Sequence, residues 1–137
     1  MTLACRCPLA ERSDATAAAA LTRKLARELG MAAAASERLA LATLELATNA
    51  VRHAGSGEME MHVEWDRVTV VVLDRGPGLD TPERLFEDRP RNPAEAWQPG
   101  QSLGAGGPSV RRLVDEASAR RREGGGLEVR AVMRRRR

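Results

Sequence analysis

The sequence predicts an α+β fold, a two-layer sandwich in which helices cover one face of a mixed, mostly antiparallel sheet. Two segments within residues 13–54 carry apolar side chains at helical spacing. Residues 58–73 and 127–133 instead show the alternation or the continuous apolar run that is typical of strands. The chain has 137 residues, of which 42% are hydrophobic, which suits one domain with one core. We therefore expect a single domain over residues 1–137.

The chain is predicted to begin with a short strand and a helix. Residues 3–7 alternate weakly between apolar and polar side chains, and Pro8 is expected to end this strand. Ser13 or Asp14 can cap a helix that stops at Gly30.

A second helix follows after a short connection. Ser36 can cap it, and its apolar stripe continues to about residue 54, where Gly55 is a suitable stop. Leu39, Ala42, Leu46 and Ala50 belong to this stripe.

Two strands are predicted next. Over residues 58–65 the apolar side chains, from Met59 to Trp65, alternate with polar ones, so one face should be buried. Asp66 and Arg67 look like a tight turn, and residues 68–73 form the apolar run of a central strand.

The last third of the chain begins with a segment of low periodicity. Residues 80–102 contain four of the seven prolines, and a long irregular segment of this kind is typical of a lid or a disordered loop. Pro108 suits the first position of a helix. A short strand near residues 117–122, a glycine turn and an alternating strand over residues 127–133 complete the sheet.

Composition argues against nucleic-acid binding. Aromatic residues make up only 2% of the chain, so bases would find few rings to stack on. The net charge is +3, but ten arginines and four acidic residues lie from Arg111 onward. Residues 111–137 therefore carry a net charge of +6 and the preceding residues −3. The basic character thus belongs to the C-terminal end, which finishes in four arginines at 134–137, and not to the domain as a whole. An arginine-rich nucleic-acid tail remains the alternative to a solvated chain end.

The two cysteines, Cys5 and Cys7, are too close in sequence to staple a core. A metal site at this pair would need ligands from elsewhere in the chain, and we expect free thiols in a reducing compartment. The chain has no run of 18 apolar residues, so we expect a cytoplasmic protein without a membrane span.

Three polar clusters occupy positions where chemistry is expected. Glu45, Asn49 and His53 are spaced at i, i+4 and i+8, which places them on one face of the second helix. An amide oxygen is a hard ligand for Mg²⁺, and a carboxylate one turn away can orient or deprotonate a nucleophile. A solvated polar face is the alternative explanation of this cluster.

The second cluster, residues 74–78 (DRGPG), stands where the central strand ends. An acidic side chain there can accept a hydrogen bond from an exocyclic amine such as that of adenine, and glycines let a flat ligand approach the backbone. The third cluster, residues 103–107 (LGAGG), directly precedes a predicted helix, whose N-terminal N–H groups suit phosphate. Either cluster alone could be a simple turn or loop.

Together the three clusters resemble the motifs of the GHKL ATPase/kinase superfamily. Residues 45–54 (ELATNAVRHA) are similar to its N box, residues 74–78 to its first glycine box, and residues 103–107 to its second. Within the superfamily, residues 102–116 (SLGAGGPSVRRLVDE) are most similar to the RsbT-like members of the anti-sigma regulatory serine/threonine kinases, a group that also includes RsbW-like proteins. The resemblance covers residues 13–133 and implies the Bergerat-type ATP-binding fold, with a lid loop over residues 80–107.

The resemblance also implies roles for individual residues. Glu45 would be the catalytic carboxylate, Asn49 would coordinate Mg²⁺ at the ATP phosphates, and Asp74 would accept the adenine amine. The remaining expected contacts to the nucleotide come from Arg52, His53, Gly76, Gly78, Gly104, Gly106 and Gly107. For His53, a hydrogen bond at the helix end is the alternative to a phosphate contact.

Two positions depart from the family pattern. Gly107 stands where a leucine is common, and Leu127 stands where a threonine often supports the adenine-binding aspartate. These departures predict a looser lid and weaker nucleotide binding.

The resemblance implies an ATP- and Mg²⁺-dependent serine/threonine protein kinase of a bacterial partner-switching module for stress response. Its expected substrate is a STAS-domain, anti-sigma antagonist-like protein. The alternative is a non-catalytic nucleotide-binding switch or anti-sigma factor that sequesters a sigma factor or activates a PP2C-type phosphatase.

Overall fold

The computed structural model describes residues 1–77, 82–86 and 106–135. Within these residues a five-stranded sheet has the order β1-β2-β3-β5-β4, and each neighbouring pair is antiparallel. The strands are β1 (Thr2–Leu9), β2 (Gly57–Val63), β3 (Arg67–Asp74), β4 (Glu116–Arg121) and β5 (Leu127–Arg134). The sheet that we expected to be mixed is therefore antiparallel throughout the described part of the chain.

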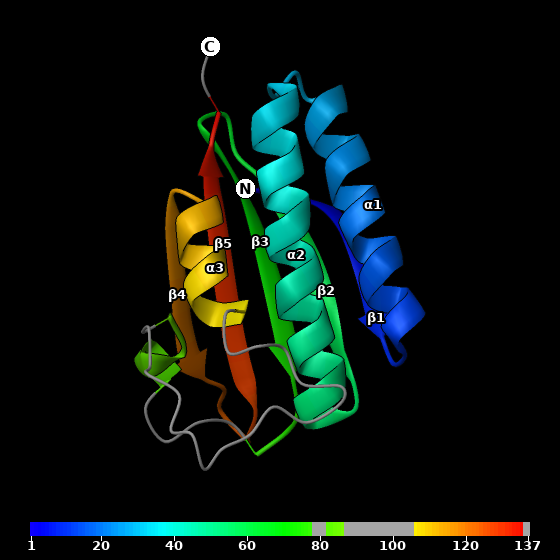
Figure 1. The fold of residues 1–137 in the computed structure, drawn as a ribbon, viewed down its shortest axis with the longest axis vertical. Coiled ribbons are helices and arrows are strands. Elements are labelled where there is room, and N and C mark those ends of the chain that lie inside the picture. The colour runs from blue at the N-terminus through cyan, green and yellow to red at the C-terminus, as the bar shows by residue number, and fades with distance from the viewer. Residues whose placement is uncertain (78–81, 87–105, 136–137) are drawn as a thin grey trace, which may run out of the picture.

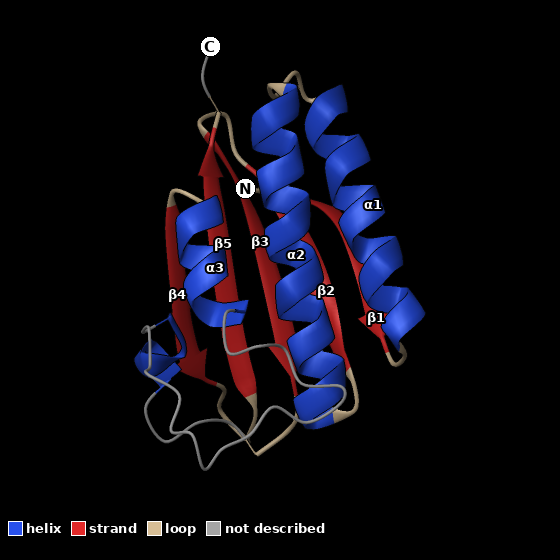
Figure 2. Cartoon of the chain, in the orientation of Figure 1, coloured by secondary structure: helices blue, strands red, loops and turns tan. Residues whose placement is uncertain are grey.

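The helices lie together on one face of this sheet (Figures 1 and 2). They are α1 (Arg12–Glu28), α2 (Ala33–Ala54) and α3 (Gly106–Leu113), with a short 3₁₀ helix, η1 (Pro82–Phe86), beside them. The predicted two-layer α+β architecture is thus confirmed. Among the described helices, none combines the length and the hydropathy that a membrane span requires.

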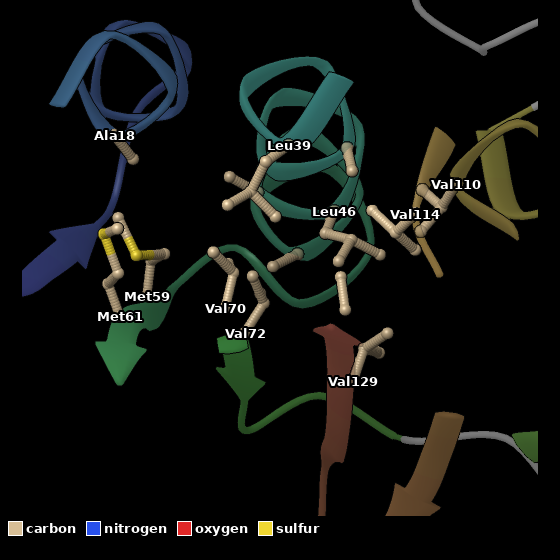
Figure 3. Close-up of a cluster of buried hydrophobic side chains, with 14 of the residues drawn as sticks. Ala18, Leu39, Leu46, Met59, Met61, Val70, Val72, Val110, Val114 and Val129 are labelled. Atoms are coloured by element: carbon tan, nitrogen blue, oxygen red, sulfur yellow. The ribbon is translucent and has the colours of Figure 1, made fainter. Parts of the chain in front are cut away.

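The core lies between α2 and the middle of the sheet. Leu39 and Leu46 of α2 face the sheet layer that holds Val70 and Val72 of β3 (Figure 3), and all four side chains are almost completely buried. Because buried residues such as Leu46 pack α2 against the sheet, the polar side chains of its C-terminal half are held at a fixed position above the sheet.

The first strand and the first helix start and end differently from the prediction. β1 continues through Pro8, which lies opposite Glu58, because an edge strand tolerates a residue without an N–H group. α1 begins at Arg12 with Glu11 as its N-cap residue. Asp14 is not the cap: its Oδ2 accepts hydrogen bonds from the N–H groups of Ala10 (2.8 Å) and Glu11 (2.9 Å), as the third residue of a capping box does.

The second helix starts three residues before Ser36. Residues 33–35 are alanines, the residue with the highest helix propensity, and Ser36 is buried within the first turn. The predicted end is confirmed, because Gly55 has a φ of 79° and its N–H donates to the carbonyl of Val51 at 3.0 Å.

Trp65 does not belong to the buried face of a strand. β2 ends at Val63, the N–H of Glu64 donates to the carbonyl of Arg67 at 2.8 Å, and Trp65 in the resulting turn is 72% exposed. At the other predicted boundary, α3 starts at Gly106 and not at Pro108.

Part of the arginine-rich C-terminal end is tied to the domain. Arg135 donates from Nη1 to the carbonyl of Glu64 at 2.8 Å and from Nη2 to that of Leu29 at 3.3 Å. The backbone N–H of Arg134 donates to Oδ2 of Asp115 at 2.7 Å. These two arginines therefore close the end of the sheet rather than extend from it, while residues 136–137 lie outside the described residues.

Candidate functional site

The C-terminal end of α2 and the C-terminal end of β3 form the frame of the candidate site. Gly76 follows β3, and a Cβ added to it would lie 2.7 Å from the Cβ of Ala54, the last residue of α2. Only a glycine allows this close approach. The structure therefore brings the first and second polar clusters together, although about 20 residues separate them in the sequence.

Asp74 is the most completely supported side chain of the site. It is 9% exposed, and its Oδ1 accepts hydrogen bonds from the N–H groups of Gly76 (3.0 Å) and Leu127 (3.1 Å). Among the described residues both of these bonds go to Oδ1, which leaves Oδ2 able to accept a donor from a ligand.

Leu127 thus supports Asp74 through its main chain. The sequence predicted weak support at this position because a leucine side chain has no hydroxyl group. The backbone N–H of β5 supplies the hydrogen bond instead, so the aspartate is oriented without a threonine.

The turn between β4 and β5 contributes two residues that sequence reasoning missed. Arg122 donates from Nη1 to the backbone carbonyl of Asp74 at 2.8 Å. Gly126 has a φ of 100°, and a Cβ there would lie 2.1 Å from that same carbonyl oxygen. The glycine run at 124–126 signalled a turn, but nothing local to it indicates a contact with Asp74.

Gly57 is a third residue of this kind. It lies opposite Asp74 in the register of β2 and β3, and a Cβ there would lie 2.3 Å from the carbonyl oxygen of Leu73. The end of β3 is therefore enclosed by glycine backbone on two sides, at Gly57 and Gly126.

Glu45, Asn49 and Arg52 follow one another along α2 and are each partly buried. Arg52 donates from Nη2 to Oδ1 of Asn49 at 2.5 Å. This amide oxygen is the atom expected to ligate Mg²⁺, so a bound cation would compete with the Arg52 guanidinium for it.

The residues of the site fit a cation that is shared with a nucleotide. In the described residues, no three or more His, Cys, Asp or Glu side chains come together in a group that could hold a metal ion. These residue types therefore do not surround a metal ion by themselves in this part of the chain. Mg²⁺ in proteins commonly takes one or two protein oxygens together with phosphate oxygens and water. Asn49 would offer one such oxygen if the negative charge of a phosphate drew Arg52 away.

His53 lies near both Arg52 and Asp74. The pKa of His53 is lowered below its ordinary value, mainly because the surrounding protein desolvates the ring and to a smaller extent because Arg52 is positively charged. The residue as a whole is nevertheless exposed. The carboxylate of Asp74 acts on the pKa in the opposite direction. His53 is therefore neutral at pH 7 when no anion is bound, and it can donate or accept a hydrogen bond.

The predicted glycines divide into three groups. Gly76 belongs to the frame described above, Gly106 and Gly107 are the first two residues of α3, and Gly78 and Gly104 lie outside the described residues. Most of the predicted lid loop, residues 80–107, also lies outside them, apart from η1 and the start of α3.

The sequence model of the family described as "histidine kinase-like ATPase domain" matches residues 8–133 of the chain. The chain belongs to this family. It therefore has the fold of a kinase-like ATPase, and the predicted membership of the GHKL superfamily is confirmed.

Two similar proteins extend this result. The serine/threonine-protein kinase RsbT of Bacillus subtilis (strain 168) is 33% identical over 123 residues, which cover 87% of each chain. A chain in the crystal structure of the SiaB-SiaC complex from Pseudomonas aeruginosa has a TM-score of 0.67, at 14% identity, over 96% of this chain and 89% of that one. The second similarity concerns the fold alone.

Proposed function

We propose that this protein is an ATP- and Mg²⁺-dependent serine/threonine protein kinase of a partner-switching module. Its substrate would be a hydroxyl group on a STAS-domain, anti-sigma antagonist-like protein. The observation that carries the proposal is the intact set of polar groups on one frame: Glu45 and Asn49 on α2, beside an Asp74 held by Gly76 and Leu127. The 33% identity to a serine/threonine kinase over 87% of the chain supports the reaction type.

Each residue of the frame has a distinct task in this proposal. Asp74 accepts the adenine amine through Oδ2, because the Gly76 and Leu127 N–H groups hold the carboxylate in place. Asn49 offers Oδ1 to the cation, and the N-terminus of α3 directs backbone N–H groups towards phosphate. When bound, Mg²⁺-ATP supplies the phosphoryl group that is transferred.

Glu45 has the task of general base. It lies one helical turn before Asn49, on the same face of α2, and its carboxylate accepts the proton of the substrate hydroxyl as that oxygen attacks phosphorus. A positioned base of this kind contributes about 10²–10⁴-fold to a rate. Because the substrate hydroxyl comes from a partner protein, the reaction requires that partner to dock over this end of α2.

The experiment is phosphoryl transfer from labelled ATP. The protein is incubated with Mg²⁺ and a STAS-domain protein from the same organism, and the label on the partner is followed over time. We expect transfer by the wild type and its loss in Glu45→Ala. Absence of transfer by the wild type, or undiminished transfer by Glu45→Ala, would refute the proposal.

A second candidate function is a nucleotide-binding switch without catalysis. The hydrogen bond from Arg52 to Asn49 favours it, because it occupies the oxygen that a catalytic Mg²⁺ needs. Such a switch would sequester a sigma factor or activate a PP2C-type phosphatase, and either module would place the chain in the cytoplasm. It is distinguished from a kinase by ATP binding without phosphoryl transfer to any partner.

A further inference from the structure

Four sulfur-containing side chains lie on one face of the sheet where β1 pairs with β2. Cys5 lies opposite Met61, and Cys7 lies opposite Met59. Side chains two residues apart on a strand share a face, and directly opposed residues have their Cβ atoms about 4.5–5.5 Å apart. The cysteines and methionines therefore form a two-by-two arrangement on the side of the sheet that faces the helices.

The two methionines are sealed beneath α1. Both have an exposed fraction of 0%, and Figure 3 shows their side chains next to one another between β2 and Ala18 of α1. The cysteines are partly buried and pack against the same core. Because β1 is an edge strand and its two cysteines are only partly buried, an ion would meet Cys5 and Cys7 first and the methionines behind them.

The two thiols contact each other. The side chain of Cys5 forms a hydrogen bond with that of Cys7 and another with the backbone of Met61, and burial raises the pKa of the Cys5 thiol to about 11. The two thiols therefore lie close together. The charged side chains of these strands, such as Arg6 and Glu60, pair with one another on the opposite face, so no carboxylate or imidazole of β1 or β2 shares the face of the sulfurs.

We propose that Cys5, Cys7, Met59 and Met61 form a binding site for Cu(I). Thiolate and thioether sulfurs are soft ligands that select this ion, whereas hard cations prefer oxygen. On binding, each thiol loses its proton to solvent and its sulfur forms a bond to the metal, while the thioethers donate lone pairs and lose nothing. The metal stays Cu(I), so no electron is transferred. The site is built on β1, β2 and α1, and it does not depend on the proposed kinase activity.

The test is a titration of the full-length, reduced protein with Cu(I) under anaerobic conditions, with bicinchoninate as the competing chelator. We expect one Cu(I) per chain and an X-ray absorption spectrum with sulfur as the only near neighbour. In Cys5→Ser/Cys7→Ser, stoichiometric binding should be lost. In Met59→Leu/Met61→Leu, a change that nearly conserves volume, the affinity should fall at least about tenfold, since even outer-shell changes weaken metal sites about 10–100-fold.

Two controls separate ligation from packing. Met133→Leu removes a buried methionine from β5, which does not neighbour β1 or β2 in the sheet, and should bind Cu(I) like the wild type. Circular dichroism of each variant confirms that it is folded, and Met61→Leu alone serves if the double methionine variant does not fold. The proposal is overturned if the wild type binds no Cu(I), if the double serine variant still binds it, or if the folded methionine variants bind it with unchanged affinity.

Discussion

Arg52 donates a hydrogen bond to Oδ1 of Asn49, three residues earlier on α2, at 2.5 Å. The same oxygen is the proposed Mg²⁺ ligand, and the guanidinium also lowers the pKa of His53. Without nucleotide, the Arg52 guanidinium therefore occupies the oxygen that we propose as the Mg²⁺ ligand. Phosphates that bind here would offer Arg52 a stronger, charge-assisted partner and would release the amide for the cation. Nucleotide and Mg²⁺ should therefore bind cooperatively.

Arg52→Ala should change the two binding steps in opposite directions. Removal of the competing donor should lower the Mg²⁺ concentration for half-saturation several-fold, since a hydrogen bond contributes about 1 kcal/mol net. Loss of a positive charge should weaken binding of Mg²⁺-free ATP. Isothermal titration calorimetry measures both. Arg38→Ala, an exposed arginine on the same helix, is the matched control, and an unchanged Mg²⁺ requirement in Arg52→Ala would contradict the competition.

Asp74→Asn should separate adenine recognition from support of the fold. The amide oxygen can still accept the N–H groups of Gly76 and Leu127, but its NH₂ group replaces the free acceptor and opposes the adenine amine. We expect a folded protein whose ATP affinity falls about 10–100-fold, in line with about 1–3 kcal/mol for an unsatisfied buried group. Asp74→Ala should in addition lower the free energy of unfolding, because it leaves the buried N–H of Leu127 without this acceptor. Equal ATP affinity in Asp74→Asn and wild type would exclude Asp74 as the adenine contact.

Gly126→Ala should destabilise the fold and disturb Asp74. Its Cβ would lie 2.1 Å from the carbonyl oxygen of Asp74 at a φ of 100°, whereas Gly124, at a φ of 85°, has nothing within 4 Å of such a Cβ. Gly124→Ala should therefore show only the cost of the left-handed conformation, about 1–2 kcal/mol, and Gly126→Ala a larger loss together with weaker ATP binding. Urea denaturation and calorimetry test this order, which an equal loss in the two variants would contradict.

The pH dependence of stability should contain a contribution from His53. Because the pKa of His53 is lowered in the folded state, the unfolded chain binds its proton more readily. The contribution to stability is present above the unfolded pKa of about 6.5 and is lost as the pH falls through the folded pKa. His53→Gln should flatten this decline in urea denaturation between pH 7.5 and 5. An NMR titration of the wild type that places the His53 midpoint at or above pH 6.5 would contradict the lowered pKa of this residue.

The sequence predicts the parts of this fold that local chemistry encodes. The helical stripe of α2, its glycine stop at Gly55 and the apolar run of β3 are visible as patterns, and the polar clusters mark the ends of these elements. The hydrogen bond from Leu127 to Asp74 was not predictable, because it joins residues 53 positions apart through a backbone N–H that no side chain announces. The close approach of Gly126 to the carbonyl oxygen of Asp74 was not predictable either, because it depends on how the strands pair. The contact between Arg52 and Asn49, by contrast, follows from their i, i+3 spacing and could have been read from the sequence.

Glu45→Gln tests whether the site performs chemistry beyond binding. The substitution keeps the size and polarity of the side chain but removes its capacity to accept a proton, so ATP affinity should remain within about twofold, as expected of a residue that acts only in the transition state. Transfer to a STAS-domain partner should fall about 10²–10⁴-fold. The matched control is Glu37→Gln on the same helix, whose carboxylate forms a surface ion pair with Arg23 at 2.7 Å and contributes little to stability. Loss of transfer in Glu45→Gln alone assigns the base to Glu45. Equal loss in both variants would indicate a general effect on α2, and equal transfer in Glu45→Gln and wild type would place the base elsewhere.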